Sequence, residues 1–372
     1  MLFKDIPGLT DIKKTLITAI RQGHVAHAQL FFGNEGGGSL AMALAYATYL
    51  NCEDKAPDDA CGRCYSCIKL NKLIHPDFHQ IFPVATTKKV SSNPLSEHFL
   101  PDWRNFLKES PYNCLSDWLA FIGTENKQAN ISAEESRQVI GKLSLKAFEA
   151  QYKVLLLWLP EMLHVSAANA LLKILEEPPP KTVFLLVSHQ PDKVLTTIRS
   201  RTQLVQVRAF SDAEIAQVLT AAHGVEPKRA AQIAQLSDGN LNRALRLTGD
   251  TREDHHAMFR NWMNLCAMRK YGELIEWTEK FSKLSRDAQK NLMQYGIGMI
   301  REALVWSQQE RGLVRLEGEE LAFVERFSKI MTLEKAEWLY KQLNEACFHL
   351  ERNGNPKIVF LDTSLAVASG IR

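Results

Sequence analysis

Two kinds of apolar pattern run along this chain, and together they predict an α/β fold. Residues 154–159, VLLLWL, form a continuous apolar run that is typical of a buried parallel strand and too short to cross a membrane. Apolar positions then recur at helical spacing over 167–177, with Ser166 as the expected N-cap. Three prolines at 178–180 end this helix, and 182–188 is a second buried strand. The order predicts a parallel β-α-β unit with a right-handed crossover.

The remaining pattern predicts further strands and then a long helical region. Strands are expected at 27–33, 75–82 and 203–208, and an amphipathic helix at 11–21 precedes the first of them. Beyond residue 251 the chain carries helical apolar stripes without recognisable motifs. Helices are predicted there near 252–268, 271–283, 285–310, 318–331, 332–352 and 356–369.

Length and composition are those of a globular protein with more than one domain. The chain has 372 residues, of which 45% are hydrophobic, so two or three domains are expected. Its 45 basic and 42 acidic residues give a net charge of +3, which is too close to balance to create a strong field toward nucleic acid or membranes. The N-terminus does not resemble a signal peptide, and no apolar stretch reaches membrane-spanning length. We therefore expect a soluble, cytoplasmic protein.

Four of the seven cysteines have the spacing of a metal site. Cys52, Cys61, Cys64 and Cys67 follow the pattern C-x8-C-x2-C-x2-C. In a cytoplasmic chain such a cluster indicates metal binding rather than disulfides. Four thiolates can enclose one ion tetrahedrally and leave no open position, so the pattern predicts a structural zinc site; the alternative is four unrelated reduced cysteines. The other cysteines, expected in the core, are Cys114, Cys266 and Cys347.

The segment GNEGGGSL, residues 33–40, stands where a phosphate-binding loop would, between a predicted strand and a predicted helix. The working motif G-x-x-x-x-G-K-[ST] needs a lysine for the phosphates and a hydroxyl for Mg²⁺. Here Ser39 and Leu40 take those two positions, so we predict no hydrolysis of ATP. A helix N-terminus still attracts phosphate, so nucleotide binding stays open beside the alternative of a plain glycine-rich turn. The candidate nucleotide contacts are Gly33, Gly36, Gly37, Gly38 and Ser39.

Several motifs resemble the clamp-loader branch of the AAA+ family. NALLKILEEPP at 169–179, followed by a strand and by TIRSR at 197–201, carries most of the resemblance. HAQLFFG at 27–33 and the four-cysteine spacing are also similar to the family. The resemblance covers residues 1 to about 250 with specific motifs, and the remainder only by its helical pattern.

The resemblance implies an AAA+ P-loop-type α/β domain, a small zinc module, a helical lid and an all-α collar. An insertion near 83–130 is longer than the corresponding link in the family; it is either a helical elaboration packed on the domain or a surface for docking a partner. The implied ranges are 1–208 for the α/β domain, 52–67 for the zinc module, 209–250 for the lid and 251–372 for the collar and oligomerisation domain.

The resemblance also implies roles for single residues. Arg201 would project as an arginine finger into the nucleotide site of an adjacent subunit, where such a residue stabilises charge on the transferring phosphoryl group. Arg243 matches the lid arginine that senses nucleotide, and we interpret it here as structural. In an active relative the strand 154–159 would end in Asp-Glu, but this chain has Trp158 and Leu159 there, with Glu161 displaced by two residues. A second element of the hydrolytic site is therefore missing.

The implied function is that of a subunit without ATPase activity of its own in the DNA polymerase III clamp loader. It would join delta and tau/gamma subunits in a hetero-oligomeric ring and help to place the sliding clamp on primed DNA. One alternative is an active ATPase of the tau/gamma type. Another is a zinc-dependent nucleic-acid-binding module, against which stands the small number of basic residues near the cysteines. These are Arg63, Lys69 and Lys72.

Overall fold

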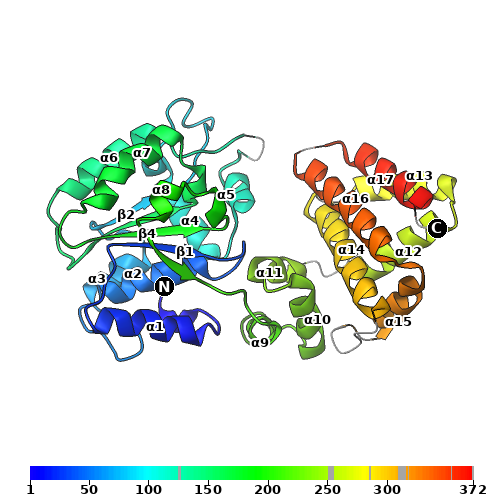
Figure 1. The fold of residues 1–372 in the computed structure, drawn as a ribbon, viewed down its shortest axis with the longest axis horizontal. Coiled ribbons are helices and arrows are strands. Elements are labelled where there is room, and N and C mark those ends of the chain that lie inside the picture. Colours follow the sequence, from blue (N-terminus) through cyan, green and yellow to red (C-terminus); the bar gives the residue numbers. More distant parts are fainter. Residues whose placement is uncertain are drawn as a thin grey trace. The chain divides into compact units, whose positions relative to one another are not determined.

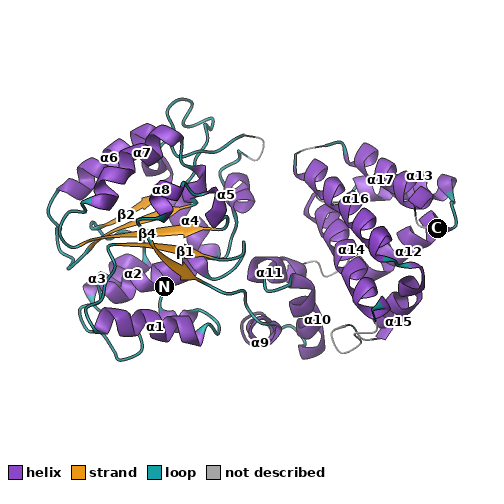
Figure 2. Ribbon diagram, in the orientation of Figure 1, coloured by secondary structure: helices purple, strands orange, loops and turns teal. Residues whose placement is uncertain are grey.

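The computed structural model describes residues 1–124, 127–249, 255–284, 286–308, 316, 318–352 and 354–370 (Figures 1 and 2). The chain divides into two compact units, Met1–Leu245 and Arg246–Arg372. Residues 125–126 of the insertion lie outside the described part, as do 250–254 at the predicted boundary of lid and collar. The prediction of three domains stays a prediction.

The first unit is built on a parallel sheet of five strands in the order β2-β3-β4-β1-β5. Every residue of β3 and β4 is buried, which explains why these two strands read as continuous apolar runs. In register, Leu30 of β1 lies beside Leu186 of β4, and Leu157 of β3 lies on the other side of Leu186. The predicted parallel α/β fold is confirmed. The strands are β1 Ala28–Phe32, β2 Phe78–Ile81, β3 Lys153–Trp158, β4 Thr182–Ser188 and β5 Gln203–Gln206.

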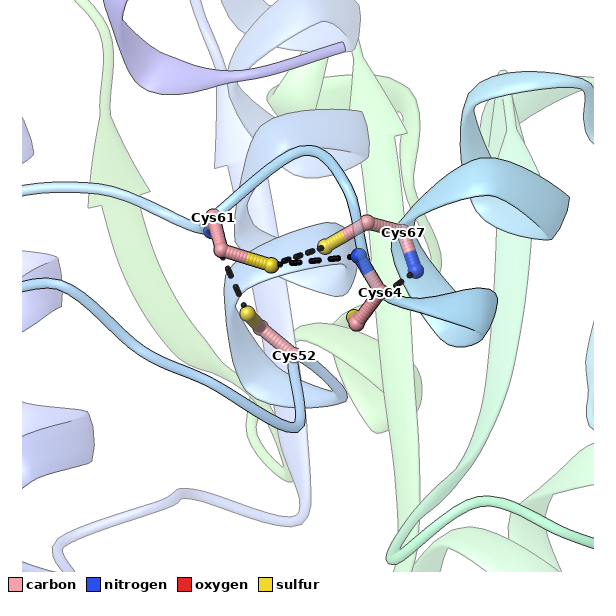
Figure 3. Close-up of side chains that lie close together, drawn as sticks. All are labelled: Cys52, Cys61, Cys64 and Cys67. Atoms are coloured by element: carbon pink, nitrogen blue, oxygen red, sulfur yellow. Dashed lines mark hydrogen bonds between the residues drawn. The ribbon is translucent and has the colours of Figure 1, made fainter.

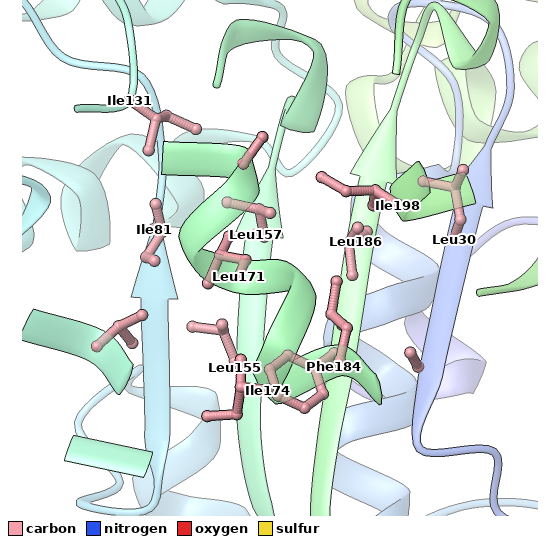
Figure 4. Packing of buried hydrophobic residues seen from close by; sticks show 14 of the residues in the cluster. Leu30, Ile81, Ile131, Leu155, Leu157, Leu171, Ile174, Phe184, Leu186 and Ile198 are labelled. Atoms are coloured by element: carbon pink, nitrogen blue, oxygen red, sulfur yellow. The ribbon is translucent and has the colours of Figure 1, made fainter. Parts of the chain in front are cut away.

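Helices cover both faces of this sheet (Figure 1). On one face, all twelve residues of α2 (Ser39–Leu50) are buried, between the sheet and its neighbours α1 (Thr10–Arg21) and α3 (Tyr65–Asn71). On the other face lie α6 (Ala133–Ser144) and α7 (Val165–Glu176). Figure 4 shows the apolar core on the second face. Its central residues are Leu155, Leu157, Leu171, Ile174, Phe184 and Leu186.

The helix α7 begins two residues earlier than expected, at Val165. Its N-cap is His164, whose Nδ1 accepts the backbone N–H of Ser166 at 3.4 Å. The prediction of Ser166 as the N-cap is therefore wrong. Ser166 lies in the first turn instead, with its hydroxyl 2.7 Å from the same imidazole nitrogen.

The described residues of the insertion include two α-helices that pack on the domain, α4 (Leu100–Glu109) and α5 (Leu115–Phe121). Its aromatic side chains form a cluster with the strand ends, in which the Trp103 ring lies 4.2 Å from that of Phe82 and 5.0 Å from that of Trp158. The Trp118 ring lies 5.2 Å from that of Trp103. Cys114, expected in the core, is only half-buried because it stands at the N-cap of α5.

Three further helices follow β5, in the region where a lid was predicted; we call them the three-helix segment. The short helix α8 (Thr196–Arg199) precedes β5. A capping box of Ser211 and Glu214 starts the first of the three. They are α9 Asp212–His223, α10 Pro227–Ser237 and α11 Leu241–Gly249.

The described residues of the second unit form helices close to the predicted positions. Their shared core contains stacked rings, with Phe360 centred 4.2 Å from Phe281 and 5.1 Å from Trp277. The predicted helical residues 252–254, 285 and 309–310 lie outside the described part. Within the described ranges, none of the helices combines the length and apolarity needed to span a bilayer. The helices are α12 His255–Ala267, α13 Tyr271–Ser282, α14 Arg286–Ser307, α15 Gly318–Phe327, α16 Leu333–Glu351 and α17 Pro356–Gly370.

Candidate functional site

The glycine-rich loop follows β1 directly and leads into α2, as a phosphate-binding loop would. Ser39 begins α2 and is 1% exposed, and its hydroxyl has no hydrogen-bond partner. Because a serine hydroxyl is neutral, Ser39 offers no positive charge to a phosphate, unlike the lysine of the working motif. The carbonyl of Val207, which follows β5, approaches Gly33 so closely that a Cβ there would lie 2.3 Å from it.

The same loop is held by the start of α11. The backbone N–H of Leu241 donates to the carbonyl oxygen of Gly36 at 3.1 Å. Gly36 has a φ of +71°, and a Cβ on it would lie 2.0 Å from Oδ1 of Asn240. Asn240 is fixed in turn, because its Oδ1 accepts the backbone N–H of Arg243 at 2.8 Å. Gly36 therefore packs directly against Asn240, and both its positive φ and this close contact require a glycine.

No carboxylate of an active hydrolytic site stands at the end of β3. Trp158 is 0% exposed and packs against the tilted ring of Trp103, with centroids 5.0 Å apart, and Leu159 is also buried. Glu161 serves a structural purpose: its Oε1 accepts the backbone N–H groups of His189 and Gln190 at 3.1 and 3.3 Å. Burial raises the pKa of this carboxyl group. Trp158 and Leu159 therefore place no acid at the end of β3, and one oxygen of the nearby Glu161 is engaged by two backbone N–H groups.

The four clustered cysteines come together after α2, as Figure 3 shows. Cys52 follows α2, Cys61 lies in the loop, Cys64 caps α3 and Cys67 lies within that helix. Their sulfur atoms all lie within 4.8 Å of one another, and those of Cys61 and Cys67 are 4.0 Å apart. Around one zinc ion with Zn–S bonds of about 2.3 Å, sulfur atoms would stand about 3.8 Å apart. The cluster could hold a single tetrahedral metal ion.

The surroundings of the sulfur atoms suit thiolate ligands. Backbone N–H groups donate to sulfur in succession, from Cys61 to Cys52 at 3.3 Å, from Cys64 to Cys61 at 3.3 Å and from Cys67 to Cys64 at 3.4 Å. Burial acts against ionisation at Cys61, but N–H donors from Arg63 and Cys64 outweigh it and lower the pKa of this thiol to about 7. Burial raises the pKa of the Cys52 and Cys67 thiols. A cation would offset that cost, so the donor set fits a closed structural site.

Basic residues around the cysteines are largely paired with carboxylates. Arg63 bonds Asp54 at 2.9 Å, and Lys69 bonds Glu149 at 2.6 Å. Such pairs leave little positive charge for a phosphate backbone. The pairing argues against a nucleic-acid-binding module built on the cysteine cluster.

Arg201 lies between α8 and β5 and is held by its own domain. One of its guanidinium nitrogens donates to the carbonyl oxygen of Thr197 at 2.7 Å, and the other bonds Oε1 of Glu176 at the end of α7. The side chain is 33% exposed. Thr202, which replaces the cysteine of the resembling motif, is satisfied locally because its hydroxyl donates to the carbonyl of Arg199 at 2.9 Å.

The register of the sheet shows that Arg201 and the glycine-rich loop lie at opposite ends of two adjacent strands, β5 and β1. Gln203 at the start of β5 pairs with Gln29, whereas Gln206 at its end pairs with Phe32, next to Gly33. The four residues of β5 alone span about 13 Å. Arg201 precedes this strand and the loop follows its partner, so they lie at opposite edges of the sheet.

The sequence did not lead us to predict two residues that contact the loop region, Asn240 and Asn242. Arg243 was singled out in the motif GNLNRAL, but its neighbours Asn240 and Asn242 make the contacts with the loop and with the insertion. Asparagines are common at helix starts, where they act as N-caps, so these two residues gave no specific prediction of a contact with the loop or the insertion.

Comparison with known proteins gives consistent results. The family model described as "DNA polymerase III, delta subunit" matches residues 8–211. DNA polymerase III subunit delta' of Yersinia pestis is 28% identical over 345 residues, which cover 91% of this chain and 87% of that protein. The delta' subunit of Pseudomonas aeruginosa is 33% identical over 176 residues, 47% of this chain and 41% of that protein.

More distant relatives belong to the same polymerase. DNA polymerase III subunit tau of Bacillus subtilis is 26% identical over 250 residues, 66% of this chain and 37% of that protein. A solved structure of a gamma subunit-related protein of DNA polymerase III from Thermotoga maritima aligns with 97% of this chain and 100% of its own. The identity is 14% and the TM-score 0.42, so the family assignment rests on the sequence matches.

Proposed function

This chain belongs to the DNA polymerase III delta-subunit family, and on that premise we propose that it is a delta-prime-like clamp-loader subunit that supplies Arg201 to ATP bound by a neighbouring subunit. It would not hydrolyse ATP itself. Its partners would be delta and tau/gamma subunits in a ring that places a sliding clamp on primed DNA in the cytoplasm. The second unit would form the collar of that ring, and the four cysteines would hold a structural zinc ion.

The absence of hydrolysis is supported at two separate points of the chain's own loop region. Ser39 brings no charge to the loop, and Leu40 brings no metal ligand. At the end of β3, the buried ring of Trp158 stands where a catalytic carboxylate would be needed. Restoring one element would leave the other missing.

The position of Arg201 is the observation that carries the proposal. It precedes β5, whereas the glycine-rich loop follows β1, so it lies away from the loop of its own chain, and this placement supports a role at a neighbour's nucleotide. The ion pair with Glu176 is partly exposed to solvent and orients the guanidinium group. Such pairs contribute only about 0–1 kcal/mol, so the guanidinium is bound weakly. The multiply charged phosphates of ATP are a stronger partner and would displace Glu176 at little cost.

The test is the ATPase rate of the reconstituted loader, stimulated by clamp and primed DNA. Arg201→Ala should lower turnover about tenfold or more, because a finger supplied in trans contributes about 10³–10⁵ in related systems. Arg199→Ala is the matched control, since Arg199 lies two residues away and pairs with Asp192 on the surface at 3.1 Å. It should leave turnover within about twofold. Unchanged turnover with Arg201→Ala in an intact loader would overturn the proposal.

An active ATPase of the tau/gamma type remains the rival function. ATP hydrolysis by the chain alone distinguishes the two. Turnover above the level of a Ser39→Ala control would favour the rival, whereas no turnover is expected here.

A further inference from the structure

The insertion reaches across to the start of α11 through the half-buried side chain of Asp117. The Nδ2 of Asn242 donates to Oδ2 of Asp117 in α5 at 2.7 Å. Asn242 is 7% exposed and Asp117 is half-buried, so this bond is partly shielded from water. The same Asp117 oxygen also accepts the backbone N–H of Cys114 at 2.8 Å, which holds the carboxylate in place at the start of its helix. A hydrogen bond to a charged acceptor is among the stronger side-chain hydrogen bonds.

Asn242 also belongs to the contact between α11 and the glycine-rich loop. Its backbone N–H points to the carbonyl oxygen of Gly36 at 3.4 Å, beside the shorter bond from Leu241. One residue therefore touches the loop with its backbone and the insertion with its side chain. The loop, the insertion and the three-helix segment meet at this point.

A second contact links the same three parts. The ring of Tyr112, in the insertion, meets that of Phe210 edge-on with centroids 5.8 Å apart. Phe210 precedes α9, and its ring lies so close to Gly38 that a Cβ there would be 3.3 Å from it. Both rings are buried. The insertion thus braces the three-helix segment at the connection before α9 and at the start of α11.

The base of the insertion is rigidly anchored. Trp103 and Trp118 are both 0% exposed and pack on each other, and Trp103 packs on Trp158 at the end of β3. The indole N–H of Trp118 donates to the carbonyl of Pro83 at 2.8 Å. Movement of the insertion away from the sheet would expose this aromatic cluster, so it acts as a stiff part of the domain.

We infer that the insertion is an internal strut that holds the three-helix segment against the glycine-rich loop without any ligand. A ligand bound between two elements stabilises their closed arrangement by its contacts with both. Here Asp117 and Tyr112 make such contacts as part of the chain. The strut would keep the first unit in one conformation throughout a loading cycle. In that respect the inference rests on the proposed role as a subunit that does not hydrolyse ATP.

Hydrogen exchange of the full chain tests the strut. Asn242→Ala should speed amide exchange over residues 212–245 by about tenfold, because a hydrogen bond to a charged group is lost. Exchange in β1, β3 and β4 should stay unchanged. Glu97→Ala is the matched control: it removes a bond of 2.7 Å from the insertion to Lys142 in α6 and leaves the contacts with the three-helix segment in place.

A double-mutant cycle shows whether the bond itself is responsible. Asp117→Ala should speed exchange in the same region, and adding Asn242→Ala to it should have little further effect. Unchanged exchange over 212–245 in Asn242→Ala, equal acceleration throughout the first unit, or additive effects of the two substitutions would each overturn the inference. Because exchange is measured on the chain alone, its result is independent of the loader ATPase that tests Arg201.

Discussion

Replacing Trp103 by alanine tests whether the insertion is part of the domain core. The indole is 0% exposed, stacks on Phe82 with centroids 4.2 Å apart and packs against Trp158. Its N–H also donates to Oε1 of Gln80 at 3.1 Å, which ties α4 to β2. One substitution therefore removes both the centre of the aromatic cluster and a bond to the sheet.

The expected loss of stability is large. Truncating a fully buried tryptophan costs about 3–5 kcal/mol, and the lost hydrogen bond adds about 1 kcal/mol. Against a total of about 5–15 kcal/mol for a typical domain, such a loss removes a large part of the folding free energy. For a unit of this size, a loss of about 4–6 kcal/mol corresponds to a fall in melting temperature of about 8–24 °C.

Thermal unfolding followed by far-UV circular dichroism measures this loss without depending on tryptophan fluorescence. Trp103→Phe keeps a stacked ring and should lose less than half as much stability. Phe121→Ala is the control, because Phe121 belongs to the same cluster but is 38% exposed. A melting temperature for Trp103→Ala within about 2 °C of the wild type, or a loss no larger than that of Phe121→Ala, would refute the reasoning.

Three further predictions concern the rest of the first unit. Cys61→Ser, or a strong chelator, should lower the melting temperature of the metal-loaded chain and release one zinc ion per chain by elemental analysis; no metal in the purified wild type would contradict this. Gly36→Ala should destabilise more than Gly23→Ala, because both glycines have positive φ but only Gly36 has a neighbour within reach of a Cβ; equal melting temperatures would contradict it. The hydrogen bond from Arg208 lowers the pKa of Glu214 to about 2, so this group contributes stability that is complete above its ordinary pKa of 4.5 and lost as the pH falls toward 2. Urea unfolding at several acidic pH values should accordingly show a smaller loss for Glu214→Gln than for the wild type.

Sequence alone determined those features that depend on near neighbours along the chain. The apolar runs of β3 and β4 predicted buried parallel strands, and both are buried in full. The cysteine spacing predicted a cluster, and the four sulfur atoms come together because a loop and one helical turn suffice to unite them. The missing charge at Ser39 and the missing acid at Trp158 could also be read from their places in local motifs. The trans role of Arg201 stays a prediction.

Tertiary structure alone decided how the insertion and the loop region are arranged. Trp103 finds its place against Trp158, and Asp117 meets Asn242 across 125 positions of sequence. Such contacts depend on the strand order β2-β3-β4-β1-β5, which carries β2 and the insertion after it to the edge beside β3. Local pattern specifies which residues prefer burial, but their partners are set by loop closure over long distances and by the packing of whole elements.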